Sequence, residues 1–106
     1  MQVIVDNKDF DLIDCKSFYS RLKGLMFVKS FDYCLLFKKC SSIHTFFMYR
    51  NIDVVMTDVD NNVLYVYKDL KPFRIIFPKH GVYNTYEFPS GSVEFNLKKV
   101  VIVGDN

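Results

Sequence analysis

Short runs of β-branched and aromatic residues, separated by turn-forming residues, make up most of this chain. Such runs are typical of β-strands. We expect strands near residues Gln2–Val5, Tyr33–Phe37, Ile43–Tyr49, Ile52–Val59, Val63–Tyr67, Asn84–Phe88 and Lys99–Val103. About seven short strands with frequent turns predict a mostly β fold, either a β-sandwich or a partly open barrel.

The turn between two of these runs is predicted by local chemistry. Asp58, Asp60, Asn61 and Asn62 stand together, and Asn and Asp tolerate the positive φ of tight hairpin turns. We therefore expect an antiparallel hairpin here.

The near-continuous apolar run Lys99–Val103 is typical of a strand buried on both faces.

Only one segment has helical spacing. Phe18, Leu22 and Leu25 recur every three to four residues, which predicts one short N-terminal α-helix that begins between Cys15 and Phe18. Gly24 should weaken or end this helix.

The 106 residues predict a single domain, 1–106, which is long enough to bury a core without metal or disulfide staples. The net charge of +2 comes from interspersed charges rather than a basic stripe, which argues against nucleic acid as a partner. No run approaches the ~20 apolar residues of a spanning helix. We therefore expect no membrane span, and the sequence leaves the oligomeric state open.

Three cysteines, Cys15, Cys34 and Cys40, cannot all pair within one chain, and no Cys-x-x-Cys spacing occurs. We expect free thiols, no metal site and no cofactor.

Asp6 and Asp9 interrupt the amino end before a long apolar run can develop, so the chain as written reads as cytoplasmic. A chain from which an export signal had been trimmed would look the same.

Four polar residues stand in apolar surroundings and are candidates for a binding or structural cluster. These are His44, Asp53, Arg74 and Glu87. His44 is either a buried structural imidazole or a functional one with a free nitrogen. Asp53 either ties down the preceding turn through backbone N–H groups or pairs with His44 or Arg74.

Arg74 and Glu87 have the same ambiguity between an internal partner and an exposed function. Arg74 should pair with Asp53, Glu87 or Asp105, or else bind an anion. Because each group needs a partner nearby, we expect His44, Asp53 and Arg74 to converge in space. Gly91 and Gly104 should occupy turns with positive φ.

These residues support three functional classes. The first is a non-catalytic binding module for a small ligand or a partner protein. The second is a small hydrolase or transferase with His44 as base and Asp53 orienting it, although no nucleophile motif is recognisable. The third is a structural or accessory domain that docks by a strand edge. We assign no catalytic residue.

Several motifs occur in an order that resembles domain-of-unknown-function family 192, a widespread prokaryotic family. They are Arg21–Met26, Ser42–Met48, Ile52–Val55 followed by Asp58, Leu70–Arg74, Glu87–Gly91 and Gly104-Asp105. None is specific alone, but the ordered set spans about residues 21 to 105. Two positions depart from the family pattern, because Asn51 replaces a common proline and Phe73 a common tryptophan.

The resemblance implies a compact, mostly β domain with a short helix, in agreement with the strand pattern. Many members of the family look exported. The family has no established reaction, so the resemblance implies a fold and leaves function open.

Overall fold

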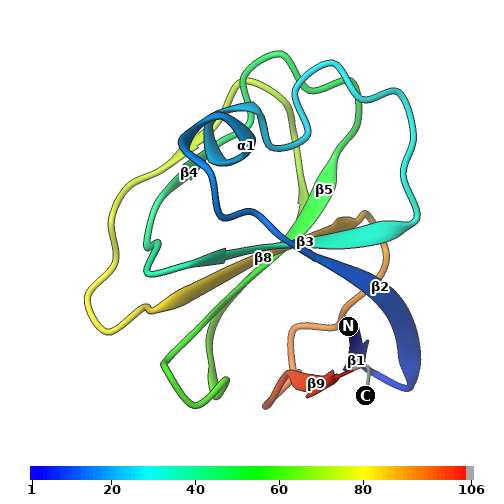
Figure 1. Cartoon of the computed structure of the whole chain (residues 1–106), viewed down its shortest axis with the longest axis vertical. Helices are drawn as coiled ribbons and strands as arrows, with labels where there is room; N and C mark the ends of the chain where they lie inside the picture. The colour runs from blue at the N-terminus through cyan, green and yellow to red at the C-terminus, as the bar shows by residue number, and fades with distance from the viewer. Residues whose placement is uncertain (105–106) are drawn as a thin grey trace.

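The computed structural model describes residues 1–104, and within them the chain forms nine strands and one helix. The strands and helix are β1 (Gln2–Val5), β2 (Lys8–Asp14), α1 (Phe18–Lys23), β3 (Tyr33–Lys38), β4 (Ile43–His44), β5 (Ile52–Thr57), β6 (Val63–Leu70), β7 (Ile75–Ile76), β8 (Asn84–Pro89) and β9 (Val101–Val103). The mostly β fold with one short N-terminal helix is therefore confirmed (Figure 1).

Seven strands form one curled sheet in the order β6-β5-β8-β3-β2-β1-β9, while β4 and β7 pair separately. All neighbours are antiparallel except β2 and β3, which are parallel and connected through α1. The two edges of the sheet approach each other, since Asn62 bridges to Lys99 and the N–H of Val63 donates to the Lys98 carbonyl at 2.9 Å. The sheet is thus a half-barrel, the open-barrel alternative of the prediction.

Two local features formed as expected. The turn between β5 and β6 is organised by Asp58, whose carboxylate accepts from the N–H groups of Asp60 and Asn62, each at 2.9 Å. Asn61 takes the positive φ of this turn. Helix α1 is capped by Ser17, whose hydroxyl accepts from the Ser20 N–H at 3.0 Å.

The sheet separates two hydrophobic layers. Val3, Leu36, Val55, Tyr86 and Phe88 belong to the layer inside the curl, with Val93 and Val100 closing it. The opposite layer lies under α1 and the β4–β7 pair. It contains Leu25, Leu35, Phe37, Met48, Val54 and Ile76. Successive residues of a strand face opposite layers.

Three expectations about strands were wrong. Strand β2 was not predicted, although the two-residue turn Asp6-Asn7, with φ of 48° and 64°, starts it. The run Ile43–Tyr49 is a strand only at Ile43–His44, because Thr45 is buried and bonds to a distant loop. The run Lys99–Val103 is not buried on both faces, because β9 is an edge strand with Val101 and Val103 exposed.

Candidate functional site

A cavity of about 260 Å³ lies between the end of α1, the β3 and β8 strands and the β4 segment. Its walls are mainly apolar and are formed by Leu22, Phe37, Ile43 and Met48. The polar groups that line it come from different parts of the chain. They are Arg21 and Lys23 on α1, Cys40 and Ser42 beside β4, His44 on β4, and Glu87 on β8.

Glu87 is the buried polar group of this cavity. It stands in the middle of β8 and is paired in register with Leu35 of β3 and Val54 of β5, so two apolar side chains flank its carboxyl on the face covered by α1. Only 2% of the residue is exposed, and Oε1 has no hydrogen-bond partner among the described residues. Burial raises the pKa of this carboxyl from its ordinary value of 4.5 to about 8.

Gly24 brings the end of α1 close to this carboxyl. Its N–H donates to the Ser20 carbonyl at 2.9 Å, and it ends the helix with a φ of +48°, a conformation that favours glycine. A Cβ at this position would lie 3.7 Å from Oε1 of Glu87 and 3.6 Å from the Phe37 ring. Gly24 therefore ends the helix, as expected from the sequence, and also forms part of the cavity wall.

His44 is half-buried and lines the same cavity. Its Nδ1 accepts a hydrogen bond from the Phe46 N–H at 3.2 Å, and its ring stacks on Phe46 with 5.2 Å between centroids. A neutral imidazole that accepts at Nδ1 carries its proton on Nε2. No described residue hydrogen-bonds to Nε2, so His44 can offer an N–H donor to a ligand.

The three cysteine thiols are free. Cys40, at the cavity, donates its S–H to the Ser42 carbonyl at 3.0 Å. Burial raises the pKa of Cys15 to about 11, with smaller contributions from the neighbouring Glu87 and Asp14. Burial also holds the pKa of Cys34 well above its usual range. The environments of Cys15 and Cys34 therefore favour the protonated thiol, which is a poor nucleophile.

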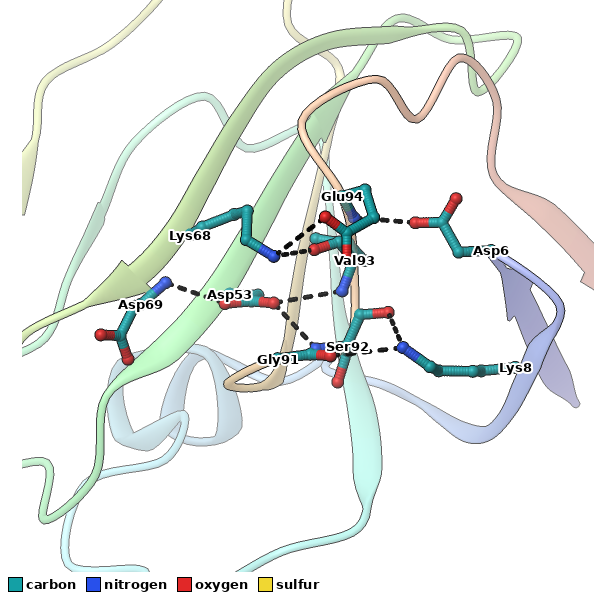
Figure 2. A network of polar contacts seen from close by, with 9 residues as sticks. All are labelled: Asp6, Lys8, Asp53, Lys68, Asp69, Gly91, Ser92, Val93 and Glu94. Carbon is teal, nitrogen blue, oxygen red and sulfur yellow. Dashed lines mark hydrogen bonds and ion pairs between the residues drawn. The ribbon is translucent and has the colours of Figure 1, made fainter.

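Asp53 lies on the other side of the sheet. It is paired with Phe88 and faces the layer inside the curl. Glu87, which precedes Phe88 on β8, faces α1 instead. Its carboxylate is fully buried and accepts from three backbone N–H groups: Asp69 at 2.8 Å, Ser92 at 2.9 Å and Val93 at 3.1 Å (Figure 2). The Tyr49–Asn51 turn is not among its partners, which corrects that expectation.

Further contacts complete a network around the segment 91–94. Lys8 donates to the Gly91 and Ser92 carbonyls, each at 3.3 Å, and Lys68 lies against the Val93 carbonyl and the Glu94 carboxylate (Figure 2). Gly91 has a φ of +86°, which confirms its predicted turn. The Asp53 carboxylate thus joins β6 to this segment through hydrogen bonds to their backbone N–H groups.

Arg74 is exposed and takes no part in an ion pair with a described residue. The internal pair with Asp53 or Glu87 is thus absent, and its third expected partner, Asp105, lies outside the described residues. The Arg74 backbone is close to His44, because His44 pairs with the adjacent Ile75. Gly104 does not adopt positive φ, which corrects that expectation.

Sequence reasoning named His44 and Glu87 but not the residues that surround them. The structure brings these two to one cavity, keeps Arg74 at the surface beside them, and places Asp53 on the opposite face of the sheet. Arg21, Cys40 and Ser42 were missed as lining residues, because only the folded chain brings α1 and the segment before β4 to one cavity. Within residues 1–104 no group of three His, Cys, Asp or Glu side chains is arranged to hold a metal ion.

The match to known proteins covers nearly the whole chain. The profile of the DUF192 family, described as "Uncharacterized ACR", matches residues 1–100. A UPF0127 protein of Pyrococcus horikoshii is 40% identical over 84 residues, which are 74% of this chain and 71% of that protein. A UPF0127 protein of Thermococcus sibiricus is 33% identical over 85 residues, 74% of this chain.

The chain spans about half the length of the Thermococcus relative, 54%. The crystal structure of a protein of unknown function from Novosphingobium aromaticivorans has the same fold, with a TM-score of 0.77 at 14% identity. That likeness covers 95% of this chain and 82% of the other. The ordered motifs, the half-barrel and the profile match agree, and this chain belongs to the DUF192 family.

Proposed function

We propose that this chain is a non-catalytic binding module whose cavity beside α1 holds a small organic ligand. One observation carries the proposal: Oε1 of Glu87 is buried at that cavity, and no residue in the described part of the chain hydrogen-bonds to it. Leaving such an atom unpaired costs roughly 1–3 kcal/mol. Native structures retain few such atoms, and a ligand that bonds to Oε1 accounts for this one.

The lining suggests what the ligand looks like. With a pKa of about 8, the Glu87 carboxyl is mainly neutral at pH 7 and offers one O–H donor and one carbonyl acceptor. The N–H of His44 is a second donor, and Leu22, Ile43 and Met48 provide apolar contact. A small uncharged molecule with a carbonyl, amide or hydroxyl group on an apolar body fits this pattern. The volume of about 260 Å³ is below the roughly 300–1,000 Å³ of drug-sized sites.

A catalytic role for the same cavity has less support. The carboxylate expected to orient His44 was that of Asp53, and both of its oxygens bond to backbone N–H groups on the other face of the sheet. The thiol of Cys40 donates its S–H to the Ser42 carbonyl. Within the described residues no carboxylate orients His44 as a base, which favours binding over reaction.

The proposal is tested by NMR titration of the ¹⁵N-labelled chain with a panel of small neutral amides, alcohols and sugars. We expect the largest shifts at the amides of Gly24, Ile43 and His44. Ser42 is exposed at the cavity, so Ser42→Trp should block it and abolish these shifts. Ser41→Trp, one residue outside the lining, is the control that should retain them. Shifts that survive Ser42→Trp, or that gather elsewhere, would contradict the proposal.

A further inference from the structure

Four aromatic side chains stand exposed together at one end of the molecule. They are Phe27, Phe47, Tyr49 and Phe73, between 51% and 60% exposed, and we call them the aromatic crown. Phe47 stacks on Phe27 with 5.6 Å between centroids and meets Phe73 edge-on at 5.9 Å. Tyr49 meets the edge of Phe27 at 6.3 Å. Contiguous exposed apolar patches of this kind commonly mark interaction sites.

The backbone of the crown is held in a conformation that these residues rarely adopt. Phe27, Phe47 and Phe73 all have positive φ, between 61° and 64°. A bulky residue in this region is uncommon and strained, and such strain is concentrated at functional sites. Three phenylalanines from three separate loops share this conformation in one patch.

Hydrogen bonds between the loops hold the crown in place. The N–H of Phe27 donates to the Phe47 carbonyl at 2.9 Å. The buried Thr45 connects the third loop: its hydroxyl donates to the Lys71 carbonyl and accepts from the Arg74 N–H, each at 2.8 Å. The N–H of Phe73 donates to the Thr45 carbonyl at 3.0 Å. The exposed rings are therefore presented by a rigid frame.

Positive charge accompanies the crown. Its three loops, residues 26–32, 45–51 and 71–74, contain Lys29, Arg50, Lys71 and Arg74 against a single acid, Asp32. The rest of the chain has ten basic and eleven acidic residues, so the net positive charge comes from these loops. All four cations are exposed, and none forms an ion pair within residues 1–104. The loops 26–32 and 45–51 lie at the end remote from β1 and β9 (Figure 1).

We propose that the aromatic crown docks on the surface of an anionic lipid bilayer, with its rings in the interfacial layer and its four cations on lipid phosphates. Aromatic rings and basic side chains are the two groups that bind this layer from the water side. The site is separate from the cavity proposed for a small ligand, so either proposal can fail alone. Docking of this kind is peripheral, and no described helix is long and apolar enough to cross a membrane.

The geometry disfavours other occupants. A second copy of the chain would bring the same four cations face to face. An extended acidic peptide needs a groove along the rings. A cavity of about 240 Å³ lies between two crown loops and is lined by Phe31 and Arg50, but none of the four crown rings lines it. Single-stranded nucleic acid stacks its bases on open ring faces, but Phe27 and Phe47 stack on each other. A lipid bilayer surface of negative charge is flat and deformable, and it needs neither a groove nor open ring faces.

The chain has no tryptophan, so a single introduced indole reports on docking. The probe is a vesicle of phosphatidylcholine and phosphatidylserine in equal parts, compared with pure phosphatidylcholine. Wild type should sediment with the anionic vesicles only. The fluorescence of Phe47→Trp should shift to the blue and be quenched by brominated lipid. Phe95→Trp, also exposed but outside the crown, should show neither change.

Charge variants provide the quantitative test. Each basic residue near an anionic surface contributes about fivefold in affinity, from ~1 kcal/mol each. Lys71→Gln with Arg74→Gln should therefore weaken vesicle binding by roughly 30-fold without loss of folding, since both side chains are exposed. Lys98→Gln with Lys99→Gln, equally exposed, is the matched control and should change binding little.

Several results would overturn the proposal. They are failure of the wild type to bind anionic vesicles, an unshifted Phe47→Trp spectrum in their presence, and equal weakening by the two double variants. Binding of single-stranded oligothymidylate, or dimerisation, without vesicle binding would equally overturn it and would identify the other partner.

Discussion

The buried carboxyl of Glu87 should make the stability of this protein fall as pH rises. Its pKa is about 8 in the folded chain and 4.5 ordinarily. Between these two values the folded state holds a proton that the unfolded state has released. Rising pH therefore stabilises the unfolded state relative to the folded state, and the free energy of unfolding decreases. The group imposes no penalty below about pH 4.5, and its full penalty is reached above about pH 8.

The size of the effect follows from the pKa difference. Each pKa unit corresponds to about 1.4 kcal/mol, so at pH 7 the penalty is roughly 3 kcal/mol. No discount for solvent screening applies, since the side chain is completely buried. A domain of this kind has a total stability of about 5–15 kcal/mol, so the penalty is a substantial fraction. Glu87→Gln keeps the shape and removes the titration.

Urea denaturation of the wild type and Glu87→Gln across about pH 4 to 8.5 measures this penalty. Near pH 4 the free energies of unfolding of the two proteins should differ by a constant amount, which comes from the replacement of the carboxyl by an amide. Towards pH 8 the variant should gain stability relative to the wild type by several kcal/mol. Asp58 and Asp69, whose pKa values hydrogen bonds lower, are common to both proteins and cancel. A difference independent of pH, or one of opposite slope, would show that Glu87 is ionised and paired.

Two further predictions test the frame around the candidate sites. Asp53→Asn should lower the free energy of unfolding by roughly 3 kcal/mol in urea, because the amide cannot accept from all three backbone N–H groups. Asp11→Asn, exposed on β2, should stay within about 0.5 kcal/mol, and equal effects would refute the structural role of Asp53. Thr45→Val should cost about 1–3 kcal/mol and speed hydrogen exchange at the Arg74 amide. Thr45→Ser keeps the hydroxyl and should do neither, so unchanged exchange in Thr45→Val would contradict the role given to that hydroxyl.

Features set by neighbouring residues could be predicted from the sequence. The β5–β6 turn depends on Asp58 bonding to residues two and four positions away, and α1 depends on Ser17 bonding to Ser20. Such contacts are visible in a local pattern. Strand β2 could have been found on the same grounds, since Asp6-Asn7 is a hairpin turn signal and Phe10 and Leu12 alternate with polar residues.

Features set by distant residues could not be predicted. Thr45 lies in a run rich in strand-forming residues, yet its bonds to Lys71 and Arg74, more than 25 positions away, turn the chain there. The cavity likewise depends on distant segments, since residues of α1, β4 and β8 line it. The crown combines three loops whose phenylalanines have no individual sequence signal for positive φ. Tertiary contacts override local propensity at each of these places.

Asp53 and Glu87 show how a functional candidate can be separated from a structural residue. In the sequence they look alike, since each carboxyl stands between apolar neighbours on a buried strand. The pairing of β5 with β8 places them on opposite faces of one sheet. Asp53 meets three backbone N–H groups there, whereas Oε1 of Glu87 meets none. Because desolvation costs both groups free energy and hydrogen bonds offset it only for Asp53, Glu87 is the carboxyl that a ligand would stabilise.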